Sequence, residues 1–228
     1  MNQIEKNTVS ANNQLEETEY VTFINPNGKG KRILFVGNSI TRHGFRPEIG
    51  WYNDFGMAAS CIENDYVHIL ASKLDKIYPD AVYCVCQVAL WETKYQEGES
   101  ILFEYESAHK FDADIVVMRI IENCKTDDFD RNAFYKEYVK LIKYLNPKNG
   151  KVILTSGFWK HVGDEVIEKV AEDFNYPFAY LGELGENDKM KALGLFEHEG
   201  VAVHPGDEGM KEIANIIYNK IVLNELEN

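Results

Sequence analysis

The sequence contains few cysteines and no long apolar run, and these absences exclude several classes of protein. Only four cysteines occur among 228 residues, and no Cys-x-x-Cys pair indicates a zinc site. Cys84 and Cys86 would share one face of a strand, where they are too close in sequence for an ordinary disulfide, so we expect reduced core residues. No apolar run approaches the roughly 18 residues needed to cross a bilayer, so we expect no membrane partner.

Positive charge is also scarce. The chain has 24 Lys and Arg against 37 Asp and Glu, which gives a formal net charge of −13, and it contains no basic run. A surface of this sign repels a phosphate backbone, so we expect no nucleic-acid partner. No apolar stretch of a secretion signal follows Met1, and a cytoplasmic location is therefore the expectation.

The composition is otherwise that of an ordinary globular protein, with 45% hydrophobic and 27% charged residues. A chain of this length buries about 70% of its extended surface when it folds, which is enough for one substantial core. We predict a polar arm over residues 1–30, with a short edge strand at Tyr20–Ile24. One domain is expected over residues 31–228, without internal repeats.

Strand-like and helix-like segments alternate after Gly30. The expected strands are Arg32–Val36, Ala81–Val88, Asp114–Ile121, Lys151–Thr155 and Phe178–Leu181. The expected helices are Gly56–Tyr78, Glu99–Lys110, Phe129–Leu145, Asp164–Phe174 and Asp207–Leu226. Because this alternation is typical of βαβ units, we predict a three-layer, doubly wound α/β domain with a five-stranded parallel sheet.

Polar side chains follow the expected strands at the edge where such folds bind ligands. In doubly wound sheets the ligand crevice lies outside the carboxyl ends of the strands. Ser39 follows the first strand of the alternating region, Glu92 the second and Asn123 the third. His204 lies in the loop before the last helix. We interpret this coincidence as the main functional signal in the sequence.

These residue types fit acyl-transfer chemistry. The hydroxyl of Ser39 is a poor nucleophile unless a base takes its proton, and the surrounding residues lack the Gly-x-Ser-x-Gly elbow of the α/β-hydrolases. The proline after His204 favours an extended backbone that presents the imidazole to a crevice. The Asn123 amide and the backbone N–H groups of Ser39 and Ala89 are candidate oxyanion donors. Taken singly, Ser39 and Asn123 serve equally well as helix or turn caps.

Three short motifs, in order, resemble the conserved blocks of the SGNH hydrolases, also called the GDSL esterase/lipase superfamily. Gly37-Asn38-Ser39 is similar to the Gly-Asp-Ser block, Glu122-Asn123 to the Gly-x-Asn block, and His204-Pro205 with Gly209 to the closing His block. The resemblance extends over about residues 31–225. It implies a flavodoxin-like fold and serine esterase chemistry, and it is similar in particular to bacterial esterases that deacetylate carbohydrates. It also implies the roles: Ser39 as nucleophile, His204 as general base and then acid, and Asn123 as an oxyanion donor.

The sequence departs from the family pattern at four places. Asn38 replaces the usual Asp, and no glycine occurs in Val88–Trp91, so the second oxyanion N–H is assigned to Ala89 or a neighbour. Ile121 stands where the family has glycine, and we expect it to narrow the pocket. Val201 stands where the family has the Asp that orients the histidine.

Without that acid, another group must accept the Nδ1 hydrogen of His204. We expect the backbone carbonyl of Val201 to do so, giving a serine–histidine dyad. The alternatives are Glu197 first, and then Glu199 or Glu92 reaching the ring from another direction.

The predicted function is hydrolysis of a small acyl ester, with an O-acetyl group on a carbohydrate as the expected substrate. Asn38, Trp91 and Glu92 are predicted to contact that small-molecule or saccharide ester. No cofactor is expected and no metal either, because the acid and histidine spacings match no strong zinc pattern. The oligomeric state is left open.

Two other functions remain open. In a flavodoxin-type electron carrier, the loop Asn38–His43 would hold the phosphate of FMN through backbone N–H groups and Thr41. In a non-catalytic descendant of the esterase fold, the site would bind a carbohydrate or a partner without hydrolysis, as the Val201 substitution allows.

Overall fold

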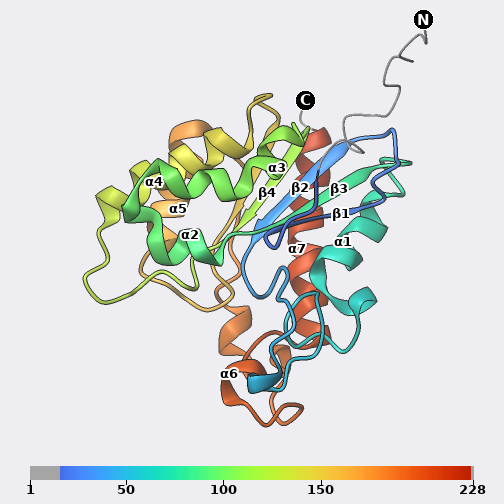
Figure 1. Cartoon of the computed structure of the whole chain (residues 1–228), viewed down its shortest axis with the longest axis vertical. Helices are drawn as coiled ribbons and strands as arrows, with labels where there is room; N and C mark the ends of the chain where they lie inside the picture. Colours follow the sequence, from blue (N-terminus) through green and yellow to red (C-terminus); the bar gives the residue numbers. More distant parts are fainter. Residues whose placement is uncertain (1–15, 227–228) are drawn as a thin grey trace, which may run out of the picture.

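A parallel β-sheet lies at the centre of the structure, a computed structural model that describes residues 16–226 (Figure 1). The strands are β1 (Val21–Ile24), β2 (Arg32–Gly37), β3 (Val82–Gln87), β4 (Ile115–Arg119), β5 (Lys151–Thr155) and β6 (Phe178–Ala179). They lie in the order β1-β3-β2-β4-β5-β6. Strands β2 to β6 are parallel, which confirms the predicted five-stranded sheet, and β1 adds a sixth, antiparallel strand at one edge through its pairing with β3.

Two layers of helices cover the sheet (Figure 1). One face carries α2 (Ala89–Lys94), α3 (Glu106–Lys110), α4 (Arg131–Leu145) and α5 (Asp164–Phe174), and the other carries α1 (Tyr66–Leu74) and α7 (Asp207–Leu226). Alternate residues of β2 enter the two cores: Leu34 and Val36 pack on the first side, and Ile33 and Phe35 on the second. Burial on both faces explains the nearly continuous apolar sequence of the strand.

The strand order creates a site where β2 meets its two neighbours. Counted without β1, the parallel strands follow the order 2-1-3-4-5 of flavodoxin-like folds, whose ligands bind beside the first strand. Gly37, the last residue of β2, pairs with Gln87 of β3 on one side and Arg119 of β4 on the other. The three strands therefore end level, and the residues after them share one edge of the sheet.

Two helices differ from the sequence prediction. The helix expected over Gly56–Tyr78 begins only at Tyr66, because Asp65 caps it by accepting a hydrogen bond from the backbone of His68, and it ends at Leu74. The helix expected over Glu99–Lys110 is a 3₁₀ helix over Glu99–Tyr105 that continues into α3. Strand β6 is also shorter than predicted.

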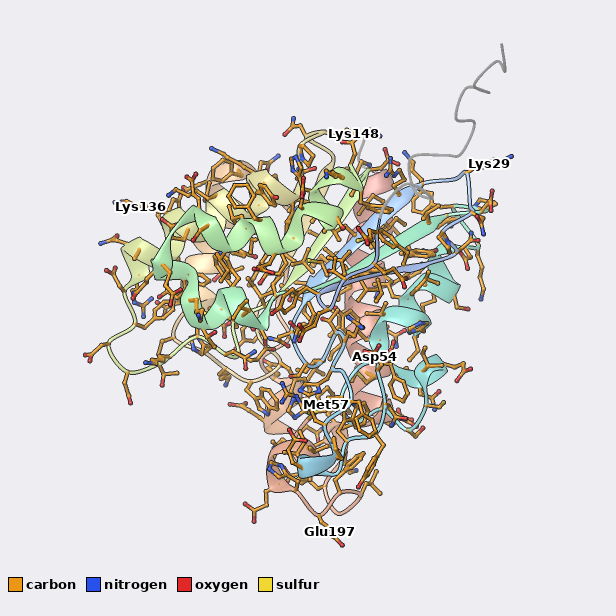
Figure 2. All side chains as sticks on the ribbon, in the orientation of Figure 1. Lys29, Asp54, Met57, Lys136, Lys148 and Glu197 are labelled. Carbon is orange, nitrogen blue, oxygen red and sulfur yellow. The ribbon has the colours of Figure 1, made fainter. Side chains whose placement is uncertain are left out.

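A small lobe extends beyond the carboxyl ends of the strands. We define the lobe as residues 43–60, which follow the Ser39 turn, together with residues 190–205, which contain α6 (Glu199–Ala202) (Figure 1). Its own core consists of Trp51, Met57, Ala58, Ala192 and Val201. Figure 2 shows Met57 inside the lobe and Glu197 at its far tip.

Candidate active site

Ser39 lies in a tight turn at the end of β2. The Asn38 carbonyl accepts hydrogen bonds from the N–H groups of Thr41 (2.9 Å) and Arg42 (3.0 Å), so the chain folds back directly after the strand. This turn requires glycine at position 37, because a Cβ there would lie 1.6 Å from Thr41 Oγ1. The Gly-Asn-Ser sequence thus places the serine hydroxyl at the edge of the sheet where the crevice is expected.

His204 faces this hydroxyl and is held in one tautomer. Its Nε2 lies 2.9 Å from Ser39 Oγ, and its Nδ1 lies 2.6 Å from the carbonyl oxygen of Gly200. A carbonyl oxygen can only accept, so Nδ1 carries the hydrogen in the neutral ring. The lone pair of Nε2 is therefore directed at the serine, as a general base requires.

The group that accepts the Nδ1 hydrogen differs from all four candidates predicted for it, the Val201 carbonyl and the side chains of Glu197, Glu199 and Glu92. The acceptor is a backbone carbonyl, as expected for a dyad, but it belongs to Gly200. The Val201 carbonyl accepts instead from the backbone N–H of His204 (3.0 Å), and Glu197 is exposed at the tip of the lobe. The reason lies in the single turn α6: backbone N–H groups already occupy the carbonyl groups of Glu199 and Val201, whereas the Gly200 carbonyl accepts from the imidazole.

The surroundings of His204 favour its neutral form. Burial lowers the pKa of His204 to about 4; the Gly200 carbonyl and Glu122 oppose this shift, whereas His43 and Arg119 add to it. The ring of Trp159 contacts the imidazole edge-on at 5.3 Å between centroids. The imidazole is therefore unprotonated, and able to accept a proton, over most of the pH range.

A cluster of buried polar side chains lies beneath the Ser39 turn. Asn38 donates through Nδ2 to Glu92 Oε1 (3.0 Å) and to Glu122 Oε2 (2.6 Å), and its Oδ1 accepts from Arg119. Arg119 also pairs with Glu122 at 2.5 Å. Burial raises the pKa of Glu92 to about 7, and Glu122 adds to the shift. Burial acts in the same direction on Glu122, but Arg119 and the hydrogen bonds from Phe158 and Asn38 hold the pKa of Glu122 below its usual value.

Three residues predicted to contact substrate are instead buried. Asn38 is 0% exposed, and Trp91 and Glu92 are each 1% exposed. Trp91 packs on Tyr95 and Phe134 in the core on the α4 side of the sheet. The sequence prediction missed α2, which begins two residues after β3 and turns positions 91 and 92 toward the interior.

The predicted oxyanion donors have different environments. Within residues 16–226, no group accepts a hydrogen bond from the Ser39 N–H. The Ala89 N–H, by contrast, donates to Gln87 Oε1 (3.2 Å), so it is already occupied. Asn123 is exposed, and its Nδ2 donates to Glu92 Oε2 at 2.6 Å, which leaves the second amide hydrogen for another acceptor.

Ile121 does not narrow the crevice. It is 0% exposed, and its side chain lies against Gly157 and Gly163, where added Cβ atoms would come within 2.8 and 2.7 Å of it. Its backbone has φ 145°, a conformation that glycine adopts far more readily. The chain thus combines a backbone conformation that favours glycine with a buried isoleucine side chain.

Two surface hollows lie on or beside the lobe, and neither is lined by Ser39 or His204. One of about 360 Å³ is lined by residues next to Ser39 in sequence, Arg42 and His43, and by Gln87 at the end of β3. Another of about 630 Å³ lies in the lobe between Pro47–Gly50 and Leu195–His198. In the part of the chain that the structure describes, no group of three or more His, Cys, Asp or Glu side chains is placed to hold a metal ion. None of the helices within residues 16–226 is long and apolar enough to span a membrane.

Comparison with solved structures identifies the architecture. The esterase EstA from Pseudoalteromonas sp. superposes with a TM-score of 0.57 at 15% identity, over 87% of this chain and 100% of its own. The acetyl xylan esterase AlAXEase superposes with a TM-score of 0.52 at 18% sequence identity, over 82% of this chain and 98% of its own. The lipase/acylhydrolase from Enterococcus faecalis superposes with a TM-score of 0.51 at 15% sequence identity, over 84% of this chain and 95% of its own. The fold is that of the SGNH hydrolases.

The SGNH fold confirms the family resemblance at the level of architecture. The sequence itself matches no protein-family model and no curated protein sequence. At these identities the comparisons establish the fold, whereas the chemistry rests on the chain's own side chains. In this SGNH fold, Ser39 and His204 lie in direct contact, and Asn123 is joined to the same edge of the sheet through Glu92.

Proposed function

We propose that the chain is a serine esterase that hydrolyses a small acyl ester, with an O-acetylated carbohydrate as substrate. The observation that carries the proposal is the 2.9 Å distance between Ser39 Oγ and His204 Nε2. This nitrogen has a free lone pair because the other ring nitrogen, Nδ1, donates its hydrogen to the Gly200 carbonyl. The similar structures support it: one is an acetyl xylan esterase, and the EstA structure is described as inhibited by monoethylphosphonate.

In this mechanism, Ser39 Oγ attacks the acyl carbon while His204 Nε2 takes its proton. The carbonyl oxygen becomes an oxyanion, for which the Ser39 N–H and the second Asn123 amide hydrogen are the donors. The imidazolium then gives its proton to the leaving alcohol, and an acyl-Ser39 ester remains. Water attacks this ester, His204 takes the proton of the water, and collapse releases the carboxylic acid and returns a proton to Ser39.

The Gly200 carbonyl takes the place of the usual acid in this scheme. It accepts the Nδ1 hydrogen, fixes the ring orientation and stabilises the imidazolium through its dipole. The dipole is a weaker partner than a carboxylate, but the charge of Glu122 also favours the protonated ring. The dyad therefore retains some of the electrostatic support that a triad has.

The proposal is tested by two measurements on the purified chain. Hydrolysis of p-nitrophenyl acetate and butyrate is compared, and a serine-directed fluorophosphonate is allowed to react before the labelled peptide is identified by mass spectrometry. We expect faster turnover of acetate and a single label on Ser39, because among the serines within residues 16–226 only Ser39 is hydrogen-bonded to an imidazole. Absence of both turnover and label would overturn the esterase proposal and favour a non-catalytic binding protein.

The same preparation distinguishes the flavin alternative. Thr41, which would have to bind the FMN phosphate, is 1% exposed and is hydrogen-bonded to the Tyr66 hydroxyl at 2.7 Å. We therefore expect a colourless protein, and flavin absorbance that co-purifies with the chain would contradict this expectation.

The low pKa of His204 predicts that activity persists to a lower pH than an ordinary histidine base would allow. Since the neutral ring is the general base, kcat/KM should stay nearly constant as the pH falls to about 5 and should decline only near the pKa of about 4. An unshifted histidine would give a decline near pH 6.5. The measurement is the initial rate with an uncoloured acetate ester between pH 4 and 8, followed by chromatography of the released alcohol.

Circular dichroism at each pH is the control for this profile. A histidine whose pKa is lowered by folding contributes stability above pH 6.5, and that stability is lost as the pH falls toward about 4. A decline in rate that is centred near pH 6.5 in a fully folded chain would contradict the assignment of His204 as a buried base.

A further inference from the structure

We propose that Glu92 is a positioning residue for the oxyanion site, where its buried carboxylate holds Asn123 and the Ser39 turn in a fixed arrangement. The inference rests on the esterase function proposed above and goes beyond it. Neither the topology nor the family motifs assign Glu92 this role, and the sequence prediction placed it in contact with substrate.

The first reason is the set of groups that Glu92 binds. Its Oε1 accepts from the backbone N–H of Ile121 (2.5 Å) and from Asn38 Nδ2 (3.0 Å), and its Oε2 accepts from Asn123 Nδ2 (2.6 Å). All three partners are neutral N–H donors. A carboxylate with several such donors is directional, because each oxygen is fixed by the groups around it.

The second reason is the free-energy cost of burying this carboxylate. Glu92 is 1% exposed, and the buried cation of the cluster, Arg119, hydrogen-bonds to Glu122 and Asn38. Within the described residues no cation pairs directly with Glu92. A buried carboxylate with neutral partners alone is expensive, and an apolar side chain of similar size would fill the space without that cost.

The third reason is the position of the donors along the chain. Asn38 immediately precedes the nucleophile Ser39, and Asn123 is the proposed oxyanion donor, so one carboxylate connects the two halves of the reacting site. Its bond to Asn123 uses one amide hydrogen and fixes the plane of the amide, which directs the other hydrogen. The occupied N–H of Ala89 makes this direction more important, since fewer donors remain for the oxyanion.

Substitution Glu92→Gln tests the proposal with almost no change of volume. If the glutamine oxygen keeps Ile121 and Asn38 as partners, its NH₂ group faces the NH₂ group of Asn123, and the amide of Asn123 must turn away. We expect kcat for p-nitrophenyl acetate to fall about 10- to 100-fold, with KM changed less than about threefold. Asn123→Ala should lower kcat by about 100- to 1000-fold, the usual effect of losing an oxyanion donor.

The double variant separates positioning from general structural support. Because Glu92 is proposed to act through Asn123, Glu92→Gln should lower kcat by less than about threefold in a chain that already carries Asn123→Ala. A double variant whose loss of kcat equals the product of the losses in the two single variants would overturn the proposal. A kcat within twofold of wild type for Glu92→Gln alone would also overturn it. The matched control is Glu97→Gln, whose side chain is 62% exposed outside the cluster and which should leave kcat unchanged.

A measurement on the wild-type chain keeps the proposal testable if Glu92→Gln does not fold. The side-chain NH₂ pair of Asn123 is identified by its loss in Asn123→Ala. In a ¹H–¹⁵N spectrum recorded well above the pKa of Glu92 of about 7, one hydrogen of this pair should lie far downfield because of its short bond to the carboxylate. A pair at the positions of a solvated amide would overturn the proposal. Fluorophosphonate labelling of the wild type distinguishes failure of the esterase function from failure of the role of Glu92. An unlabelled Ser39 contradicts the esterase function itself. A labelled and active wild type, together with unchanged activity in Glu92→Gln, contradicts only the role of Glu92.

Discussion

Replacement of Ser39 by alanine is expected to reduce kcat for ester hydrolysis by about 10⁴-fold or more, because the acyl-enzyme can no longer form. The fold should persist, since the hydroxyl makes one hydrogen bond, to His204, whose loss costs about 1 kcal/mol. The measurement is turnover of p-nitrophenyl acetate beside thermal unfolding of the same samples. Residual activity above about 1% of wild type in the folded variant would contradict the assignment of the nucleophile.

Ser72→Ala is the matched control for this variant. Ser72 is exposed on α1, away from the carboxyl ends of the strands, so the same chemical change should leave both turnover and stability unchanged. Both proteins are purified identically, because a trace of a host esterase would otherwise hide a loss of this size.

Asn38→Asp is expected to destabilise the fold severely, although aspartate is the residue that the family has at this position. The Asn38 amide donates to both Glu92 and Glu122, so an aspartate removes two donors and adds a third carboxylate to the buried cluster. Removing one partner from such a cluster costs about 3–5 kcal/mol, and here the new charge also repels the two that remain. The measurement is the free energy of unfolding in denaturant at pH 8.

The pH dependence of this variant identifies the cause. Burial and the charges of Glu92 and Glu122 would raise the pKa of a carboxyl at position 38, and Arg119 would oppose this shift. Because burial and two carboxylates act against one guanidinium, we expect a raised pKa, so that the penalty is fully present at high pH and falls as the pH drops. The loss of stability relative to wild type should therefore be smaller at pH 5 than at pH 8. Asn219→Asp, on an exposed position of α7, is the matched control, and an Asn38→Asp variant that is within about 1 kcal/mol of wild type at pH 8 would contradict the role given to Asn38.

The position of Ser39 at the edge of the sheet was predictable from the parallel strands, whereas its pairing with His204, which follows no strand, was predicted from the family resemblance. Strands that are apolar on both faces fix a parallel sheet, and the carboxyl ends of a parallel sheet lie at one edge. The residues that follow the strands must then converge at that edge. The bounds of β5 and α5 were likewise predicted correctly from their apolar patterns and flanking residues.

The partners of these residues were not predictable, because they depend on short elements with weak sequence signals. Helix α6 has four residues and no apolar periodicity, yet it supplies the Gly200 carbonyl to His204. Helix α2 has six residues, and its early start turns Trp91 and Glu92 inward when the sequence suggested an exposed loop. The sequence does not show whether a polar residue is buried. Only the tertiary contacts distinguish a residue that binds substrate from a residue of a buried polar cluster.

The same contacts explain why motif comparison misjudges positions 38 and 121. Asn38 and Ile121 each differ from the family residue, and each contacts residues outside its own motif. The first meets two glutamates, and the second lies against Gly157 and Gly163. A short motif does not show these contacts, because the contacting residues lie tens of positions away.

The lobe beyond the strand ends has a consequence for how the contact between Ser39 and His204 is lost. Ser39 and His204 belong to segments far apart in the chain, and the small core around Trp51 and Val201 joins the segments that follow and precede them. This core contains few residues, whereas the two cores of the sheet are extensive. Because regions with few buried contacts open at a lower free-energy cost than the whole fold, local opening of the lobe would separate nucleophile from base while the sheet stayed intact. We therefore expect the contact between Ser39 and His204 to depend on the stability of the lobe rather than on the stability of the molecule as a whole.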